Sequence, residues 1–361
     1  MRSRSSIPTF LDQSAQTMAM IRGGRAHEKT IKIGTRPVII PEPRRPANAH
    51  DRSYAIKLAL AFVTTYVVWG STYLAIRYAV ETIPPIVAVA IRHTIAGSIL
   101  LVWALARGYR PKREHWLAGF IVGLLYFTIG HGLLHWAEKS ISSGPAALLI
   151  ATEPMFIMLA GWAMGQQKPH WLSGVGFVTG FAGVAILIGP DLTTRGSAAI
   201  GLIAAVVSSL AWSVGVIISA KVKLPHDAVA RTAMPLICGA VMLWVAAIVS
   251  GEWRGFHASE ASPRSWLGLA FLIVFGSVIA FTAYTWLLQQ CSPALVATHT
   301  YANPIVAVLL GWLLAGEVLS ARLGLAAVVI LGAIVLIRRG ERMATQRALK
   351  PDCFQSEFAA D

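Results

Sequence analysis

A carboxylic acid stands in the middle of a long apolar stretch of this chain. Glu153 lies near the centre of the stretch Gly144–Met164. An ionised carboxylate at the centre of a lipid bilayer costs on the order of 2.5–3.5 kcal/mol on insertion scales, so it needs a polar partner or a proton. Two interpretations follow. Glu153 contacts a substrate ammonium group or carries a proton, or it is a neutral or paired structural carboxyl.

Prolines next to polar residues occur at related places in two such stretches. Pro154 follows Glu153 and removes the helical hydrogen bond to the Ile150 carbonyl, and Asn303 followed by Pro304 repeats the arrangement later in the chain. Two broken helices at corresponding positions predict a polar cavity between them. The alternative is that both prolines only kink their helices for packing.

Two histidines and a glutamate share one helix face. His131, His135 and Glu138 are spaced i, i+4 and i+7. The spacing is not HExxH and no further carboxylate or cysteine cluster accompanies it, so we expect no metal there. These groups line a cavity or relay protons, or they form hydrogen bonds between helices. The same choice applies to His299, four residues before Asn303.

Two arginines stand in the first two apolar stretches. Arg92 follows Pro85 by seven residues and lies deep enough to pair with Glu153 or to bind an anionic group. Arg77 lies within about a turn of the membrane boundary, where its side chain can extend to water. Amphipathic rings accept organic solutes and cations. The aromatic residues that could line the cavity are Trp69, Tyr73, Tyr284, Trp286 and Tyr301.

The composition excludes a soluble protein. Of 361 residues, 55% are hydrophobic and 13% are charged, against about 25% charged in an ordinary soluble domain. The net charge of +14 comes from basic residues clustered between apolar blocks, which indicates membrane topology and no nucleic acid partner. The three cysteines (Cys238, Cys291 and Cys353) are too scattered for a disulfide framework or a zinc site. The motifs GxSxG, HExxH and Walker A are absent, so we expect no cofactor and no enzyme.

Apolar stretches long enough to cross a bilayer follow one another from Leu58 onward. Because they are continuously apolar and do not alternate, they predict helices, and the fold class is an all-α polytopic membrane protein. The lipid bilayer is therefore a partner. The ten stretches, the last of which is short, are Leu58–Ala79, Pro85–Ala106, Trp116–Trp136, Gly144–Met164, Trp171–Ile188, Ile200–Ala220, Thr232–Val249, Trp266–Leu288, Pro293–Ala315 and Leu323–Ile337.

The chain repeats itself. At an offset of 150 residues Trp116, Trp136 and Trp162 recur as Trp266, Trp286 and Trp312, and at a slightly shorter offset Trp69 recurs as Trp212. Five helices per half place the second copy in the membrane in the opposite sense, as an inverted repeat. The predicted organisation is a disordered basic tail over 1–52, five-helix modules over 58–188 and 200–337, and a cytoplasmic tail over 338–361.

Four segments carry a family resemblance. They are WGSTYLAIRYAVETIPP (Trp69–Pro85), IRHTIAG (Ile91–Gly97), SSGPAALLIATEPMFIMLAGW (Ser142–Trp162) and CSPALVATHTYANPIVAVLLGWLLAGE (Cys291–Glu317). Over roughly residues 58–338 the chain resembles EamA-type carriers of the drug/metabolite transporter superfamily. One departure is visible: the second half carries Gly316-Glu317 where the first has Gln166-Gln167, so the halves differ in charge.

The resemblance implies a secondary carrier with a small-molecule substrate. The substrate is expected to be an amino acid or related organic solute, exported across the inner (plasma) membrane by alternating access. A polytopic membrane enzyme or a channel remains the alternative. A glycine run permits close helix contact, within the chain or in a homodimer. Its members are Gly174, Gly176, Gly180 and Gly183.

The distribution of basic residues predicts that both termini are cytoplasmic. With this orientation 23 of the 31 basic residues fall in cytoplasmic segments and 5 in outer loops, and the other three lie in or at helices. We therefore expect a phosphatase fused to Asp361 to be inactive and a fluorescent protein fused there to fold. An active phosphatase fusion would reject both this orientation and an even number of spans.

Overall fold

The computed structural model describes residues 31–33, 36–38, 52–163, 170–194, 196–291, 293–296 and 298–349. Contacts divide the chain into two units, Met1–Arg45 and Pro46–Asp361. In the first unit the strands β1 (Ile31–Ile33) and β2 (Arg36–Val38) pair antiparallel, with Ile31 opposite Val38. Three of the six residues in this hairpin are β-branched. The disordered tail predicted over 1–52 stays a prediction. The rest of that tail lies outside the described residues.

The described residues of the second unit are helical and include eight helical segments long and apolar enough to span a membrane. Two further apolar helices are shorter, Trp171–Leu187 and His299–Ala315. They coincide with the predicted fifth and ninth spans, so the count of ten and the inverted repeat stay predictions. Five helices are uninterrupted: α4 (Pro85–Ala106), α9 (Trp171–Thr194), α10 (Ser197–Ser219), α11 (Ala228–Val249) and α16 (Ala321–Leu349).

Three membrane-length helices contain a wider π-helical segment. They are α2–η1–α3 (Arg52–Val63, Thr64–Val68, Trp69–Ala79), α5–η2–α6 (Arg113–Gly123, Leu124–His131, Gly132–Ala137) and α12–η3–α13 (Pro263–Phe271, Leu272–Ile279, Ala280–Gln290). Segments of this kind are rare and concentrate at functional sites because they redirect side chains. Nothing in the hydropathy pattern predicts them. His131 is the last residue of η2, and Trp69 follows η1 directly.

Two helices are broken, as expected, but at different places relative to their prolines. The first break separates α7 (Ser143–Ile150) from α8 (Glu153–Ala163), directly before Pro154. The second separates α14 (Pro293–Val296) from α15 (His299–Ala315). Pro304 lies inside α15, so the break predicted at Asn303-Pro304 is wrong in position. Met164 and the Gln166-Gln167 pair lie outside the described residues.

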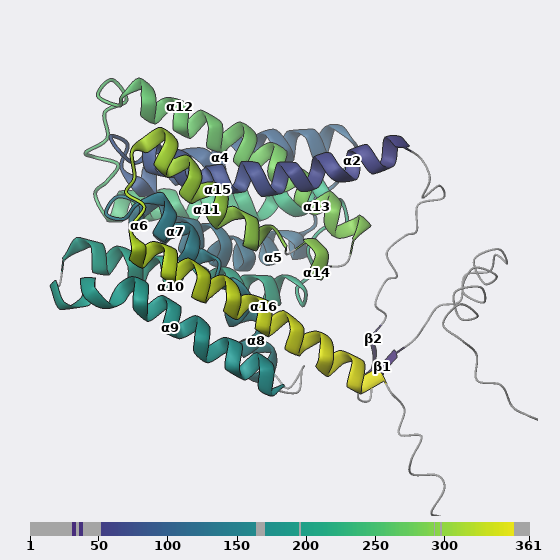
Figure 1. Ribbon diagram of the computed structural model, residues 1–361. Helices are drawn as coiled ribbons and strands as arrows, with labels where there is room; N and C mark the ends of the chain where they lie inside the picture. The colour runs from purple at the N-terminus through teal and green to yellow at the C-terminus, as the bar shows by residue number, and fades with distance from the viewer. Residues whose placement is uncertain are drawn as a thin grey trace, which may run out of the picture. The chain divides into compact units, whose positions relative to one another are not determined.

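The helices α9 and α16 lie side by side (Figure 1). Gly176 and Gly183 allow this close contact, and Gly180 makes room for Met155 of α8. A Cβ atom on Gly176, Gly180 or Gly183 would meet Ala333, Met155 or Ile330 at 2.8 Å or less, whereas one on Gly174 would meet nothing. The run therefore serves packing within the chain. Helix α16 also continues to Leu349, beyond the predicted end at Ile337, because residues 341–349 favour helix. The rest of the predicted C-terminal tail lies outside the described residues.

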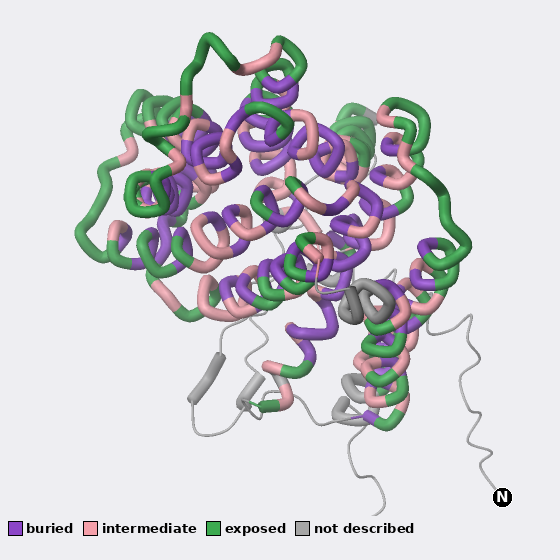
Figure 2. The backbone as a smooth tube through the Cα atoms, turned by 90° about the vertical axis from the view of Figure 1, so that its left-hand side faces the viewer, coloured by how far each residue is buried: buried purple, intermediate pink, exposed green. Residues whose placement is uncertain are grey.

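Buried residues line the inside of the bundle, and the exposed ones face outward (Figure 2). Many exposed side chains are large and apolar, including Val102, Leu117, Leu267 and Val328, each more than 60% exposed. An apolar exterior of this extent suits contact with lipid rather than water.

The contact between α5 and α11 depends on one glycine. A Cβ atom on Gly123 would lie 2.6 Å from the Pro235 carbonyl oxygen and 2.8 Å from the Gly239 nitrogen, and backbone atoms cannot move aside. We expect Gly123→Ala to lower the free energy of unfolding in detergent by about 1–3 kcal/mol. The matched control is Gly174→Ala, which adds the same methyl group in open space and should leave stability unchanged or raise it. Equal melting temperatures for the two variants would contradict this packing.

Candidate functional site

A buried cavity of about 80 Å³ lies between helices of both predicted modules. Residues of α3, α4, η2 and the α7–α8 break line it on one side, and residues of α10, α13 and α15 on the other. Seven of the predicted site residues meet here. They are Trp69, Tyr73, Arg92, His131, Glu153, His299 and Asn303.

Four other predicted aromatic and histidine side chains do not line the cavity. One of them, Trp286, lies with its ring 6.3 Å from that of Tyr54. Tyr284 stands behind its wall, where its ring lies 4.9 Å from that of Trp69. Tyr301 is half-buried and interacts with Arg338 of α16. His135 is fully buried beyond His131, towards the end of α6. The two prolines, Pro154 and Pro304, directly follow lining residues. Across the described chain, no group of three or more potential ligands could hold a metal ion.

The structure adds lining residues that the sequence did not single out. They are chiefly Thr72, Ser208, Trp212, Phe281 and Thr300. The pairing of Trp212 with Trp69 in the repeat was a usable signal, because residues at corresponding positions of an inverted repeat meet around one axis. Nothing in the sequence singles out Ser208, Thr72 or Thr300, since small hydroxyl side chains are common in membrane helices.

The Glu153 carboxyl group faces one indole and one distant cation. The indole N–H of Trp212 interacts with the carboxyl group, and Arg338 of α16 acts on it electrostatically. The expected pair between Glu153 and Arg92 is absent from the ion pairs of the described residues. The other alternative for Arg92, binding of an anionic group, stays a prediction. Arg338 was not expected near Glu153, because it lies one residue beyond the predicted end of its span.

Arg92 is 2% exposed and lines the cavity from α4. Its Nε donates to the Ser277 hydroxyl at 2.9 Å. Gly276 provides the space, since a Cβ atom there would lie 3.3 Å from Arg92 Nη2. A guanidinium carries five N–H donors in a planar fork, so one bond leaves the fork able to bind a carboxylate.

Hydroxyl groups of α10 bind carbonyls at the first helix break. Pro154 has no N–H to offer the Ile150 carbonyl, and the Ser209 hydroxyl donates to that oxygen at 3.3 Å. The Ser213 hydroxyl donates to the Glu153 carbonyl at 3.1 Å. Because an unpaired carbonyl is costly in an apolar interior, these bonds make the break tolerable beside Glu153.

A carboxamide has the same role in the second half. With its amide nitrogen assigned to face the two acceptors, Asn303 donates to the carbonyls of His299 (3.0 Å) and Tyr66 (3.2 Å). The Tyr66 and Thr298 hydroxyls are also hydrogen-bonded. Asn303 therefore joins the start of α15 to η1.

Aromatic rings form two walls of the cavity. The Trp69 ring lies 5.2 Å from Phe281 and 4.9 Å from His299, and its indole N–H donates to the Gly276 carbonyl at 3.2 Å. In the other wall the His131 and Trp212 rings stack at 5.2 Å with an angle of 15°. Rigid rings present π faces that attract organic cations.

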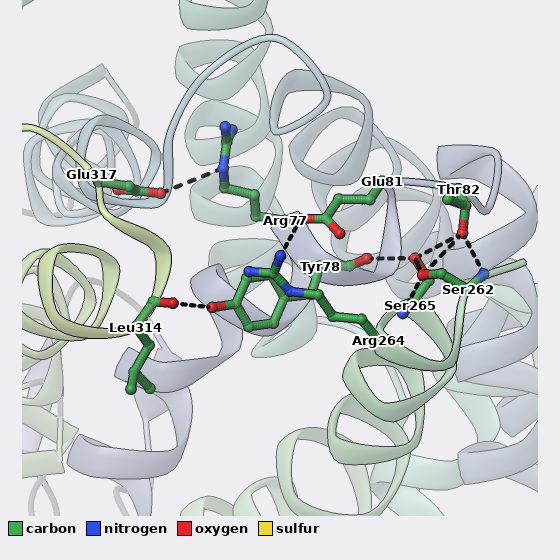
Figure 3. A network of polar contacts seen from close by, with 9 residues as sticks. All are labelled: Arg77, Tyr78, Glu81, Thr82, Ser262, Arg264, Ser265, Leu314 and Glu317. Atoms are coloured by element: carbon green, nitrogen blue, oxygen red, sulfur yellow. Dashed lines mark hydrogen bonds and ion pairs between the residues drawn. The ribbon is translucent and has the colours of Figure 1, made fainter.

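A polar network joins helices at one end of the bundle, where α3 and α15 end and α7 and α12 begin (Figure 3). We call this the Glu317 end. Arg77 Nε lies 3.5 Å from Glu317 Oε1, and the Tyr78 hydroxyl donates to the Leu314 carbonyl at 3.0 Å. These contacts tie α3 to the chain that follows α15.

The same network reaches α12. The Arg264 guanidinium lies 3.7 Å above the Tyr78 ring and 3.5 Å from Glu81. The Thr82 hydroxyl donates to that of Ser265 at 2.8 Å (Figure 3). Helix α3 of the first half is thus fastened to two elements of the second half at this end.

Glu317 is placed by a tight turn. Gly316 takes a left-handed conformation, with φ 64°, which ends α15 and folds the chain back over Gly311. The Glu317 carboxylate then accepts bonds from Ser143 N (2.9 Å), Ser143 Oγ (3.0 Å) and Gly144 N (3.4 Å) at the start of α7. A carboxylate is favourable at a helix N-terminus. The Arg77 side chain, expected to extend to water, is 36% exposed and also contacts this carboxylate.

Apolar membrane-length helices around a cavity with a few polar side chains define a polytopic membrane protein able to hold a solute. The model of the EamA-like transporter family matches residues 56–189 and again 199–339. The chain belongs to this family, within the drug/metabolite transporter superfamily, and is a multi-pass membrane transporter.

Relatives in distant organisms match most of the chain. The protein named "uncharacterized inner membrane transporter YedA" of Escherichia coli K12 is 35% identical over 284 residues, which is 78% of this chain and 90% of the relative. The "uncharacterized transporter YoaV" of Bacillus subtilis is 24% identical over 286 residues, 78% of this chain and 94% of that one. A solved crystal structure, 23% identical, has a TM-score of 0.55 and covers 80% of this chain and 99% of its own, which shows a shared fold.

The contacts of Glu317 predict a structural cost for its removal. Glu317→Gln keeps the shape of the side chain but loses the charge that binds Arg77 and the N-terminus of α7. We expect the free energy of unfolding in detergent to fall by about 1–2 kcal/mol. Glu260→Gln changes an exposed carboxylate in the loop before α12 and should cost less than about 0.5 kcal/mol. A melting temperature of Glu317→Gln equal to that of this control would contradict the role of Glu317.

Proposed function

We propose that this transporter is a secondary carrier that exports a small organic solute, an amino acid or a related zwitterion, across the inner membrane. In this proposal ten spans form two inverted five-helix modules over 58–188 and 200–337, with both termini cytoplasmic. The Glu317 end then faces the outside. The cavity is exposed to each side in turn.

The observation that carries the proposal is the placement of opposite charges in one cavity without an ion pair between them. The Glu153 carboxyl group is at the α7–α8 break, and the Arg92 guanidinium is on α4. A zwitterion can place its ammonium group at Glu153 and its carboxylate at Arg92. Charges in an apolar interior are costly unless paired, so the solute itself completes both pairs.

The walls supply the remaining recognition. Trp69 and Trp212 present rings to an organic side chain, and the Thr72 and Thr300 side chains offer hydroxyl groups. Tyr284 and Tyr301 were also expected to line the cavity. They pack behind the lining residues and do not contact the solute directly. Few polar groups and many apolar ones are typical of a small-molecule site.

The cavity is small for an amino acid. About 80 Å³ holds on the order of five water molecules, at roughly 15 Å³ each. Binding of an amino acid therefore requires the two halves to separate at one end. The network at the Glu317 end ties the halves there through a few polar contacts, which can break and reform as the cavity opens.

A channel or a membrane enzyme would behave differently in vesicles. Carrier flux saturates with solute concentration and shows counterflow, whereas channel flux does neither. An enzyme would convert the solute. A thermal-shift screen of the purified protein against amino acids and other metabolites, followed by counterflow with any hit, separates these outcomes.

The sharpest expectation concerns Glu153. Glu153→Gln keeps volume and hydrogen bonding but removes the charge. We expect insertion to be normal and counterflow of a cationic or zwitterionic solute to fall at least tenfold, which corresponds to about 1.4 kcal/mol. Any pH dependence of flux that Glu153 causes should also flatten.

The matched control is Glu260→Gln, whose exposed carboxylate is far along the chain from the lining residues and should leave counterflow unchanged. Wild-type flux with an unchanged pH profile in Glu153→Gln would make Glu153 a structural carboxyl. The binding site would then have to be sought around His131 and Arg92.

A further inference from the structure

A second buried carboxyl group lies between the cavity and the Glu317 end. Glu138 directly follows α6 and the membrane-length segment Arg113–Ala137, yet it is 1% exposed. Its side chain approaches the backbone of Arg77. Neither carboxyl oxygen has a hydrogen-bond partner of ordinary geometry among the described residues. A buried carboxylate without partners is costly, so this group needs a proton, a cation or water.

The charged groups around Glu138 come from three other elements. Arg77 of α3, Arg92 of α4 and Glu317 after α15 all act on it electrostatically. Helix α10, which packs on η2 and α6, carries no titratable side chain between Ser197 and Ser219.

The titratable side chains of α11 are directed elsewhere. The Arg231 guanidinium donates to the Ser219 carbonyl, and the Cys238 thiol lies near the Trp116 carbonyl. Arg77, the cation beside Glu138, is already bound to Glu317 at 3.5 Å. Two carboxyl groups thus share one arginine.

Burial raises the pKa of Glu138 well above its usual range, and the negative charge of Glu317 raises it further. Arg77 and Arg92 act in the opposite direction, and their effect is smaller than that of burial. Glu138 therefore holds a proton to a higher pH than an exposed glutamate does.

Histidines lead from Glu138 towards the cavity. His135 lies three residues before Glu138 and His131 four residues earlier, which are steps of about 4.5 and 6 Å along a helix axis. The Nδ1 of His135 bonds to the His131 carbonyl at 2.7 Å. Because a carbonyl only accepts, this nitrogen carries the hydrogen, and Nε2 of the neutral ring is free to accept a proton.

His131 completes the connection. It lines the cavity, and its Nδ1 lies 3.1 Å from His93 Nε2. His135 Nε2 and His93 Nδ1, like the Glu138 oxygens, are buried without a partner among the described residues. Unsatisfied polar atoms grouped in one buried region indicate a place for ordered water. Tyr73 lies between the two carboxyl groups electrostatically, since both Glu138 and Glu153 act on its hydroxyl group.

We propose that Glu138 binds the proton that drives transport, and that His135 passes this proton between Glu138 and water beside His131 at the cavity. The inference rests on the proposed carrier function. The Glu138 carboxyl group releases its proton through water to His135 Nε2, and the resulting imidazolium returns it from the same nitrogen to water beside His131. No other bond forms or breaks.

Coupling follows from the shared arginine. When Glu138 is protonated, Arg77 forms its ion pair with Glu317, and this pair joins the two halves at the Glu317 end. When Glu138 is ionised, it competes with Glu317 for Arg77 and weakens that tie. Proton binding is thereby linked to closure of one end of the carrier.

Infrared titration of the full-length protein in liposomes tests the site with the proton as the only ligand. We expect the band of a protonated carboxylic acid that persists at neutral pH and is lost in Glu138→Gln but retained in Glu153→Gln. In Glu317→Gln the band should disappear at lower pH, because removing a negative neighbour lowers the pKa of Glu138. A Glu138→Gln spectrum identical to that of the wild type would overturn the proposal.

Transport measurements with a mixture of radiolabelled amino acids test the coupling. Counterflow moves no net proton, so Glu138→Gln and His135→Gln should retain it within about twofold, while proton-driven accumulation falls at least about tenfold. Glu260→Gln, on an exposed loop, should keep both. Accumulation unchanged in Glu138→Gln would overturn the coupling. Absence of counterflow in the wild type would instead reject the carrier function, and the infrared titration would still decide whether Glu138 binds the proton.

Discussion

Every backbone carbonyl released inside an apolar bundle must find a donor, and the site depends on how this chain meets that requirement. A break beside Pro154 places Glu153 at the cavity, and it is tolerable because Ser209 and Ser213 of α10 donate to the carbonyls around it. In the second half the Asn303 carboxamide donates to the carbonyls of His299 and Tyr66. The groups that hold the broken helices in place therefore also bring the two halves together around the cavity.

A single carboxylate, that of Glu317, organises the Glu317 end of the bundle. Glu317 is turned back by Gly316, caps α7 and binds Arg77, so one side chain of the second half fixes the start of a helix and the end of another in the first. The first half has no acid at the corresponding position, where the sequence reads Gln166-Gln167. This asymmetry gives the two ends of the bundle different chemistry. Glu138 lies between this end and the cavity and links the two through Arg77.

Polar residues in apolar stretches were sufficient to predict much of the cavity. Glu153, Asn303, His131 and Arg92 meet there because burial of such groups is too costly to be accidental. What the sequence could not show depends on contacts between distant segments. Arg338 was assigned to a tail because hydropathy falls at Ile337, although the helix continues. Pro304 was expected to break a helix, but it lies inside α15. The π-helical segments carry no pattern in hydropathy, and Trp212 was recognisable only through its repeat partner Trp69.

The central claim is that the cavity between Glu153 and Asn303 is exposed to the two sides of the membrane in turn. Thr300 lines this cavity and is 6% exposed. The most direct measurement is the labelling of Thr300→Cys by a membrane-impermeant maleimide, applied from each side, in a protein with Cys238, Cys291 and Cys353 replaced by serine. The account predicts labelling from both sides and protection by a transported solute. Labelling from one side only, with or without solute, would contradict it.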